Sequence, residues 1–300
     1  MPIYNTAAYL REALDSICNQ SLQELEIILI NDGSTDESQH IIEEYAQKDS
    51  RIQCRIQSNQ GQGVARNNGL QLAKGKYIYF MDSDDFLDAD TLQQCYNICE
   101  QNNLDFVFFD AETIIEESDT SNTFTYNRKQ LFSEDRLWSG IELLNYEFDN
   151  NIFIVSTCLY FTRHSFLKEK FSGFPAGIIH EDNVFVMQIK LSAQRIRYIS
   201  QPYFKRRVRA MSTMTNRFSM RNIEGYTTAC VLVHSWSQQH PEWLSTINRY
   251  LKILNSVIWL GHRMTILEKI ETYCRLRRLN LSKYVTFKNW IVFWFKSKNI

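Results

Sequence analysis

Short apolar runs alternate with amphipathic segments over the first 110 residues of this chain. The run LEIILIND is β-branched and almost continuously apolar, as expected of a strand that is buried on both faces. The segment 6–18 instead places its apolar residues three and four apart, which predicts a helix. Such alternation is typical of the α/β class, a mostly parallel sheet flanked by crossover helices. The pattern predicts strands at 25–32, 51–56, 76–81 and 104–110, and helices at 6–18, around 41–46, at 64–74 and at 88–101.

This rhythm breaks after about residue 112. Residues 113–137 are polar and rich in turn formers, whereas 152–163 has the composition of a strand. Helical periodicity returns at 140–150 and 182–193, and from about residue 219 it continues to the end of the chain. The sequence therefore predicts an α/β part followed by a C-terminal helical extension.

Acidic residues stand where two predicted strands end. They are Asp32 and the triplet Asp82-Ser83-Asp84. In a parallel sheet both positions lie at the carboxyl edge, where ligands bind in such folds. Two carboxylates separated by one residue suit a hard divalent cation such as Mg²⁺ or Mn²⁺, which favours oxygen ligands and substrate phosphates. A solvated turn that caps the next helix explains the same residues, because aspartate is common in both roles.

A glycine-containing segment and an acidic pair are further candidates. NQGQGVARNNGL has the spacing of neither familiar phosphate-binding loop, so Gly61 and Gly63 also fit a loop that packs on the sheet. Arg66, in the first turn of the next predicted helix, is positioned to point at an anion. Glu181-Asp182 begins a predicted helix. Complementing the helix N-terminus is the simpler role for this pair, and a general base is the alternative.

Basic residues collect in one stretch of an otherwise neutral chain. Between Asn183 and Ile223 there is no acidic residue, while nine lysines and arginines lie there, Arg206 and Arg209 among them. Arginine forks suit phosphate oxygens. A solvated basic face is the alternative, and it explains the stretch less well because the net charge of the whole chain is only -1.

Composition limits the class of protein. A net charge of -1 gives no global attraction to nucleic acid, so nucleic acid is not an expected partner. The seven cysteines are scattered and contain no CxxC pair, which favours a reducing compartment and a cytoplasmic protein. The sequence shows no signal peptide and no apolar run near the ~20 residues that a membrane span needs.

Taken together, the motifs resemble family 2 of the glycosyltransferases, which have the GT-A fold. The family's order is followed over about residues 2–215 by PIYNTAAYLREALDSICNQSL, EIILINDGSTDES, GQGVARNNGL, GKYIYFMDSDDFL, HEDNVF and RRVRAMSTMT. The resemblance implies a GT-A (Rossmann-like) domain with a nucleotide-sugar-binding half at 1–112 and an acceptor-binding half at 113–215, then a helical region at 216–300. The family opens with an apolar strand that is nearly missing here, so we expect a truncated first strand.

The same resemblance implies roles for individual residues. Asp182 is implied to be the catalytic base, with Glu181 beside it to orient the acceptor. Asp84 and Asp82 are implied to bind a metal ion, Asp84 more directly, and Asp82 is also implied to bind the ribose. The other implied nucleotide-sugar contacts are Asp32 at the base, Arg66 at the nucleotide, and Arg206, Arg209 and Ser212 at the diphosphate.

The implied activity is metal-dependent, inverting transfer of a sugar from a nucleotide-sugar, with UDP-sugar foremost. The implied acceptor is a hydroxyl of a glycan or of a lipid-linked molecule in surface polysaccharide synthesis, and the implied cofactor is Mn²⁺ or Mg²⁺. One alternative is an inactive or weak nucleotide-sugar-binding protein that helps to assemble a glycan complex. The other is a sugar nucleotidyltransferase, although the sequence shows no matching phosphate loop.

The last segment, 284–300, is aromatic and basic. Phe287, Trp290, Ile291 and Trp294 share a helical stripe there, with lysines nearby. An interfacial helix on an anionic bilayer has this pattern, and so does a helix that packs on its own domain or on a second subunit. Peripheral contact with the inner face of the plasma membrane and a homo-oligomer are therefore both open.

Overall fold

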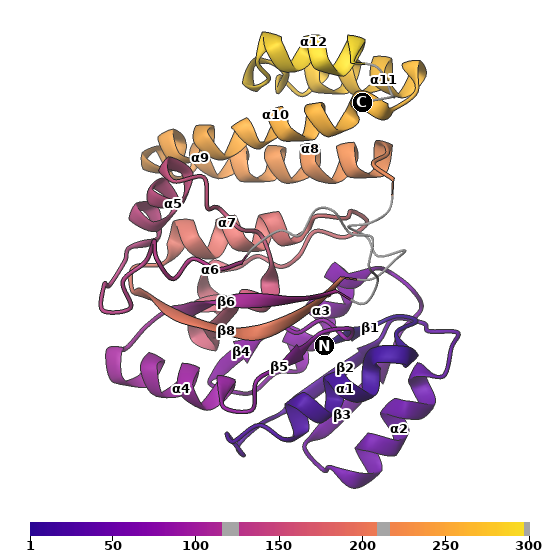
Figure 1. Ribbon diagram of the computed structural model, residues 1–300, viewed down its shortest axis with the longest axis vertical. Helices are drawn as coiled ribbons and strands as arrows, with labels where there is room; N and C mark the ends of the chain where they lie inside the picture. Colours follow the sequence, from indigo (N-terminus) through magenta and orange to yellow (C-terminus); the bar gives the residue numbers. More distant parts are fainter. Residues whose placement is uncertain (116–125, 209–216, 297–300) are drawn as a thin grey trace.

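The computed structural model describes residues 1–115, 126–208 and 217–296 (Figure 1). Its first part is a three-stranded parallel sheet in the order β1-β2-β3. The continuous apolar run of β2 is explained by its burial, since Leu29 and Ile30 are both almost fully covered. The predicted alternation is confirmed in β1 (Pro2–Ile3), α1 (Ala7–Cys18), β2 (Ile27–Asn31), α2 (Ser38–Lys48), β3 (Ile52–Ile56) and α3 (Gln62–Leu72).

A second, five-stranded sheet has the order β4-β7-β6-β8-β5. Strands β6 and β8 run parallel, and the other three pairs are antiparallel. Strand β6 extends to Ile115, three residues into the segment 113–137 that the sequence predicted to be turn-rich, because β8 pairs with it as far as that residue. The elements are β4 (Tyr77–Tyr79), β5 (Phe86–Leu87), α4 (Thr91–Asn102), β6 (Phe106–Ile115), α5 (Gly140–Asp149), β7 (Tyr160–Arg163), α6 (His164–Lys170), α7 (Asp182–Ser192) and β8 (Ile196–Val208).

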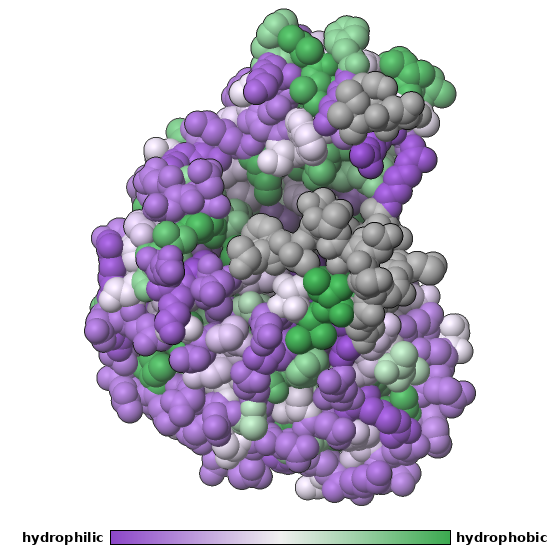
Figure 2. All heavy atoms as spheres, in the orientation of Figure 1, coloured by the Kyte–Doolittle hydropathy of each residue, from purple (hydrophilic) through white to green (hydrophobic). Residues whose placement is uncertain are grey.

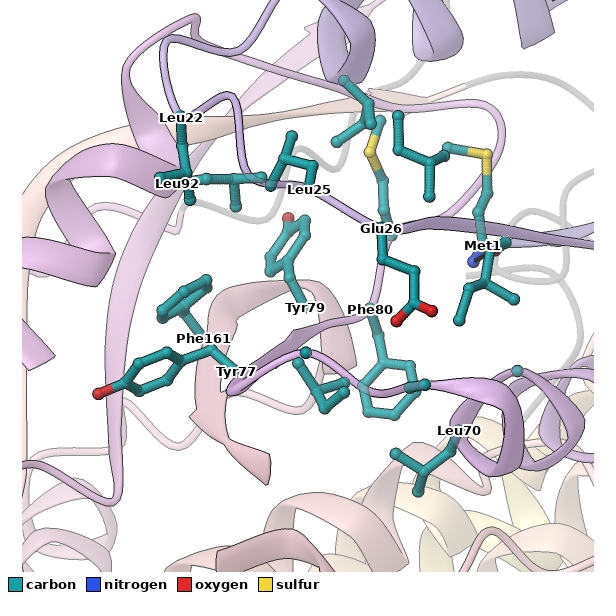
Figure 3. Close-up of a pocket in the computed structure, with 18 of the residues that line it drawn as sticks. Met1, Leu22, Leu25, Glu26, Leu70, Tyr77, Tyr79, Phe80, Leu92 and Phe161 are labelled. Carbon is teal, nitrogen blue, oxygen red and sulfur yellow. Dashed lines mark hydrogen bonds between the residues drawn. The ribbon is translucent and has the colours of Figure 1, made fainter. Parts of the chain in front are cut away.

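The two sheets are separated by a cavity of about 550 Å³ between β2 and β4. The first strand is short, as expected: β1 pairs with only two residues of β2, Ile30 and Asn31. Beyond those pairs no strand of the described residues lies between β2 and β4, so both strands face the cavity with an edge. Figure 3 shows Leu25, Leu70 and Phe80 among the apolar side chains that line this space.

A network of buried charges ties α5 and α7 together. Lys190 Nζ lies 2.7 and 2.5 Å from the two Glu147 carboxylate oxygens, and neither side chain is exposed. Arg128 Nη1 is 3.9 Å from Glu147, and its Nε donates to Asp110 at 2.8 Å. Burial lowers the pKa of Lys190 to about 8 and raises the pKa of Glu147. We call Lys190, Glu147, Arg128 and Asp110 the Lys190 cluster.

The predicted C-terminal helical extension is confirmed and builds a hydrophobic core of its own, with Leu254, Ile258 and Phe293 inside it. Leu144 of α5 and Met187 of α7 belong to the same core, so these two helices attach the extension to the α/β part (Figure 1). The helices are α8 (Met220–Ser235), α9 (Leu244–Tyr250), α10 (Leu254–Leu260), α11 (Ile266–Arg278) and α12 (Phe287–Phe295).

Short 3₁₀ turns complete the described backbone at Thr157–Leu159, Trp236–Gln238, Pro241–Trp243, Leu251–Ile253, Gly261–Arg263 and Ser282–Tyr284. The first of them replaces part of the strand predicted over 152–163. All seven cysteines lie in the described part of the chain and are free thiols. Within the same residues, no helix combines the length and the apolar character needed to cross a bilayer.

Candidate active site

The acid at the end of β2 is wrapped in hydrogen-bond donors. Asp32 is 3% exposed, and its carboxylate accepts from the backbone nitrogens of Gln60 and Gly61 at 2.8 Å and from Gln57 Nε2 at 2.7 Å. The next residue, Gly33, has φ of +76°, and a Cβ there would lie 2.9 Å from the backbone nitrogen of Asn59, in the loop between β3 and α3. Asp32 therefore fixes the turn that leads into α3.

Arg66 joins both acidic motifs that the sequence singled out. Its side chain is 3% exposed in α3; Nη2 donates to Asp82 Oδ1 and Nη1 to Glu181 Oε1, both at 2.7 Å. A Cβ on Gly63 would lie 3.1 Å from Glu181 Cγ, so the glycine lets the segment before α7 pack against α3. Residues up to 115 positions apart thus form one group, Arg66, Asp82 and Glu181, which we call the Arg66 cluster.

The first turn of α3 also connects Asp32 with Asp82. Gly61 at the start of the helix donates to Asp32, and the next residue, Gln62, donates through Nε2 to Asp82 Oδ1 at 2.8 Å. The two acids, fifty residues apart, therefore flank the same helix end, as the strand pattern predicts. For Gly61 and Gly63 this geometry favours a loop that packs on its surroundings.

The loop after β4 concentrates negative charge. Burial, followed by the charges of Asp84 and Asp82, raises the pKa of Asp85. In the described residues, no group of three or more histidine, cysteine, aspartate or glutamate side chains is arranged to hold a metal ion. Two carboxylates that repel one another fit a cation whose coordination is completed by substrate phosphates, and they do not fit a site made of protein ligands alone.

Asp182 is the first residue of α7, and its side chain is half-buried. Burial, followed by the charge of neighbouring Glu181, raises the pKa of Asp182 to about 7. An acid that only complements a helix N-terminus has its pKa lowered by that end of the helix. The raised value favours the other alternative, because a carboxylate that titrates near neutral pH is suited to general-base chemistry.

Helix α8 holds the turn that precedes Asp182. His180 has φ of +67°; its ring stacks on Tyr226 at 4.0 Å between centroids, and its Nε2 lies 3.1 Å from Asn222 Nδ2. A Cβ on Gly225 would approach the Ile179 carbonyl oxygen to 2.1 Å, so the helix and the turn touch backbone to backbone. Burial lowers the pKa of His180 to about 4, which keeps its ring neutral. The sequence reasoning missed this support, since its partners are over forty residues away.

The basic strand β8 supplies a second contact to the acidic loop. Arg207 donates through its backbone nitrogen to Asp85 Oδ1 at 2.7 Å and through Nε to the Asp84 carbonyl oxygen at 3.0 Å. The sequence reasoning chose Arg206, whose guanidinium lies 5.4 Å from the ring centroid of Tyr126. Neighbouring strand residues point to opposite faces, so the two arginines have different surroundings. Arg209 and Ser212 lie outside the described residues.

Solved structures with similar folds identify the fold of this chain. TarS from S. aureus, in complex with UDP-GlcNAc, matches with a TM-score of 0.64 at 19% identity over 93% of this chain and 87% of that one. The mannosyltransferase PcManGT from Pyrobaculum calidifontis, in complex with GDP-Man and Mn²⁺, matches with a TM-score of 0.56 at 16% identity over 99% and 86%. These similarities confirm the predicted GT-A fold.

Sequence comparison specifies the family. The model of the family described as Glycosyl transferase family 2 matches residues 1–169. An uncharacterized glycosyltransferase of Haemophilus influenzae is 36% identical over 73% of this chain and 81% of its own length. Glycosyltransferase GlyG of Streptococcus pneumoniae is 31% identical over 73% of both chains. The chain belongs to glycosyl transferase family 2.

Proposed function

We propose that this protein is an inverting glycosyltransferase that moves a sugar from a UDP-sugar to a hydroxyl of a glycan or lipid-linked acceptor in surface polysaccharide synthesis. The observation that carries the proposal is the half-buried carboxylate of Asp182, with a pKa raised to about 7, beside the Arg66 cluster. Asp182 is thereby suited to accept a proton. The adjacent Arg66 cluster connects it to the acidic loop after β4.

In this reaction the acceptor hydroxyl attacks the anomeric carbon of the donor sugar. Its proton passes to Asp182, the new carbon–oxygen bond forms, and the bond to the phosphate oxygen breaks with its electron pair on the leaving diphosphate. Attack from the face opposite the diphosphate inverts the configuration. Holding hydroxyl and donor in line supplies much of the rate, and Glu181, fixed by Arg66 at 2.7 Å, orients the acceptor.

Donor binding is assigned to the half at 1–112 and acceptor binding to the half at 113–215. Asp32 contacts the base, Arg66 supports the nucleotide, and Asp82 contacts the ribose. Asp84, with Asp82, would hold Mn²⁺ or Mg²⁺, which would neutralise the diphosphate charge. The diphosphate is also assigned to Arg206, Arg209 and Ser212.

The TarS structure with UDP-GlcNAc supports the choice of UDP, and the PcManGT structure with Mn²⁺ supports the metal ion. We also propose a cytoplasmic location, because the seven cysteines are free thiols and a reducing compartment keeps thiols in that state.

The test is calorimetry of UDP and a panel of UDP-sugars with Mn²⁺, followed by an assay of transfer or donor hydrolysis. Asp84→Ala should weaken metal-dependent binding at least ~10-fold, since one of two cation ligands is lost. Asp90→Ala, an exposed acid before α4, is the matched control and should bind as the wild type does.

Other outcomes identify the alternatives. Donor binding without turnover indicates a nucleotide-sugar-binding assembly protein. Release of pyrophosphate from a nucleoside triphosphate indicates a nucleotidyltransferase. Unchanged affinity of Asp84→Ala, with and without EDTA, contradicts the metal role.

A further inference from the structure

The far end of the helical extension exposes large apolar side chains. Nine of the sixteen exposed in the described residues lie between Trp259 and Phe295. Phe287 and Phe295 of α12 are each 80% exposed. Figure 2 shows hydrophobic residues gathered at the end of the molecule that α11 and α12 form. A patch of this kind on a folded protein marks an interaction site.

These side chains form one continuous surface. Tyr273 packs on Trp290 and Trp294, with ring centroids 5.3 and 6.2 Å apart, and so joins α11 to α12. A groove of about 610 Å³ lies along the junction, between Tyr273 on one side and Phe287 and Phe295 on the other. Along α11, exposed apolar side chains spaced three and four residues apart form a stripe that leads into this groove. We define the α11–α12 surface as Ile266, Ile270, Tyr273, Phe287, Ile291 and Phe295.

Positive charge accompanies this surface. Residues 272–300 hold seven lysines and arginines and no aspartate or glutamate, although the net charge of the whole chain is -1. Arg277, Arg278, Lys283 and Lys288 are exposed around the groove and along its two helices. The acidic residues of α11 are confined to its first half. The surface therefore combines exposed aromatic groups with a local excess of cations.

This combination discriminates between occupants. Two copies of the chain joined through the α11–α12 surface would bring their cations together, and like charges repel. A bilayer that contains anionic lipids attracts the same cations, while exposed phenylalanine, isoleucine and tyrosine side chains enter the boundary between headgroups and acyl chains. A zwitterionic bilayer would provide only the second contribution.

We propose that the α11–α12 surface docks this protein on the face of an anionic lipid bilayer as a peripheral protein. The apolar residues insert at the interface, and Arg277, Arg278, Lys283 and Lys288 contact lipid phosphates. The proposal goes beyond the sugar-transfer reaction. It concerns helices outside the Arg66 cluster, so it is tested without any measurement of activity.

The experiment is co-sedimentation of the full chain with phosphatidylcholine vesicles prepared with and without phosphatidylglycerol. Wild type should bind the anionic vesicles at least ~10-fold more strongly than the neutral ones, and added salt should weaken this preference. The double variant Phe287→Ser with Phe295→Ser should reduce binding to the anionic vesicles at least ~10-fold. Both side chains are 80% exposed, so the substitution leaves the core intact.

A second variant and a control complete the design. Lys283→Gln with Lys288→Gln should reduce the preference for anionic vesicles while weak binding to neutral ones remains. Ile56→Ser removes a side chain that is 64% exposed at the end of β3 and should bind as the wild type does. The proposal is overturned by wild type that stays in solution with anionic vesicles, or by equal binding of wild type and the phenylalanine variant. A concentration-dependent dimer that the phenylalanine variant abolishes, without vesicle binding, would assign the surface to a second copy.

Discussion

Two buried ionic clusters lie at opposite ends of α7 and differ in what covers them. The Lys190 cluster is sealed, since Lys190 and Glu147 are both 0% exposed. In the Arg66 cluster the guanidinium is 3% exposed and Glu181 8%, whereas Asp82 is 29% exposed. Helix α7 therefore has the Lys190 cluster, which we call the sealed cluster, near its last residues. The Arg66 cluster, which we call the open cluster, lies at its first residues.

Charge balance separates the clusters further. The sealed cluster pairs two cations, Lys190 and Arg128, with two acids, and Tyr198 adds a hydroxyl donor to Asp110 at 2.5 Å. The open cluster has one cation for Asp82 and Glu181, with Asp182 and the acidic loop beside them. Buried charges need pairing, and in the sealed cluster the two cations balance the two acids. The excess of negative charge at the open cluster is what a bound cation or a proton would compensate.

The strongest test of this difference is Asp182→Asn, which removes the proposed base and keeps the shape of the side chain. Transfer should fall about 10²- to 10⁴-fold, the usual contribution of a general base, while donor binding by calorimetry stays unchanged. In the wild type, activity should rise with pH through about 7, because the base acts when deprotonated. This acid limb should disappear in the variant.

The stability of Asp182→Asn should rise or stay equal while its activity falls. The pKa of Asp182 in the folded protein is raised from the usual carboxyl value of 3.8 to about 7. Its contribution to stability is therefore complete below pH 3.8 and is progressively lost as the pH rises to about 7. Asp182→Asn avoids this loss, and above pH 7 its free energy of unfolding should equal or exceed that of the wild type. Full activity of Asp182→Asn would contradict the role of Asp182 as the base, and an unfolded variant would contradict the expected stability.

Sequence pattern predicted the fold well where local periodicity decides the structure. The strand at 25–32 and the helix at 64–74 were recognisable because a buried strand and an amphipathic helix leave distinct patterns. The antiparallel pairs of the second sheet were not, because strand direction depends on partners far along the chain. The candidate residues were found by motif, yet the bond from Arg66 to Glu181 spans 115 positions and no local pattern encodes it.

Residues of the Lys190 cluster were missed as a group for the same reason. A lysine near the end of an apolar helix is indistinguishable in sequence from one that reaches solvent. Arg207 was passed over in favour of its neighbour Arg206, since the phase of a strand sets which of two adjacent arginines faces the acidic loop. In both cases the missing information is which face of the element is covered.

Substitutions in the sealed cluster should lower the free energy of unfolding without lowering transfer activity. Lys190→Met leaves Glu147 buried without its partner and should lower the free energy of unfolding by about 3–5 kcal/mol. Lys190→Met combined with Glu147→Leu removes both charges and should recover most of that loss. Urea denaturation measures both effects.

The folded fraction of the double variant should retain transfer activity, because neither residue belongs to the proposed site. If the double variant is as unstable as Lys190→Met, the pair contributes more than mutual neutralisation. If it is stable and inactive, the cluster affects the site through α7, and the two clusters are not independent.

The smallest expected effect tests the contact between α8 and the turn before Asp182, without changing any charged group. Gly225→Ala forces a Cβ against the Ile179 carbonyl oxygen, where only 2.1 Å is available, so α8 or the turn before Asp182 must shift. Overpacking of this kind costs about 1–3 kcal/mol of stability. Because the shift occurs at the turn that holds Asp182, kcat should fall more than donor affinity does.

Gly69→Ala is the matched control. Gly69 lies in α3, and its added Cβ would have its nearest neighbour at 3.5 Å. Alanine also favours the helix by ~0.5–1 kcal/mol. Equal loss of kcat in both variants would show that activity follows general helix packing; loss in Gly225→Ala alone would show that the helical extension positions the proposed base.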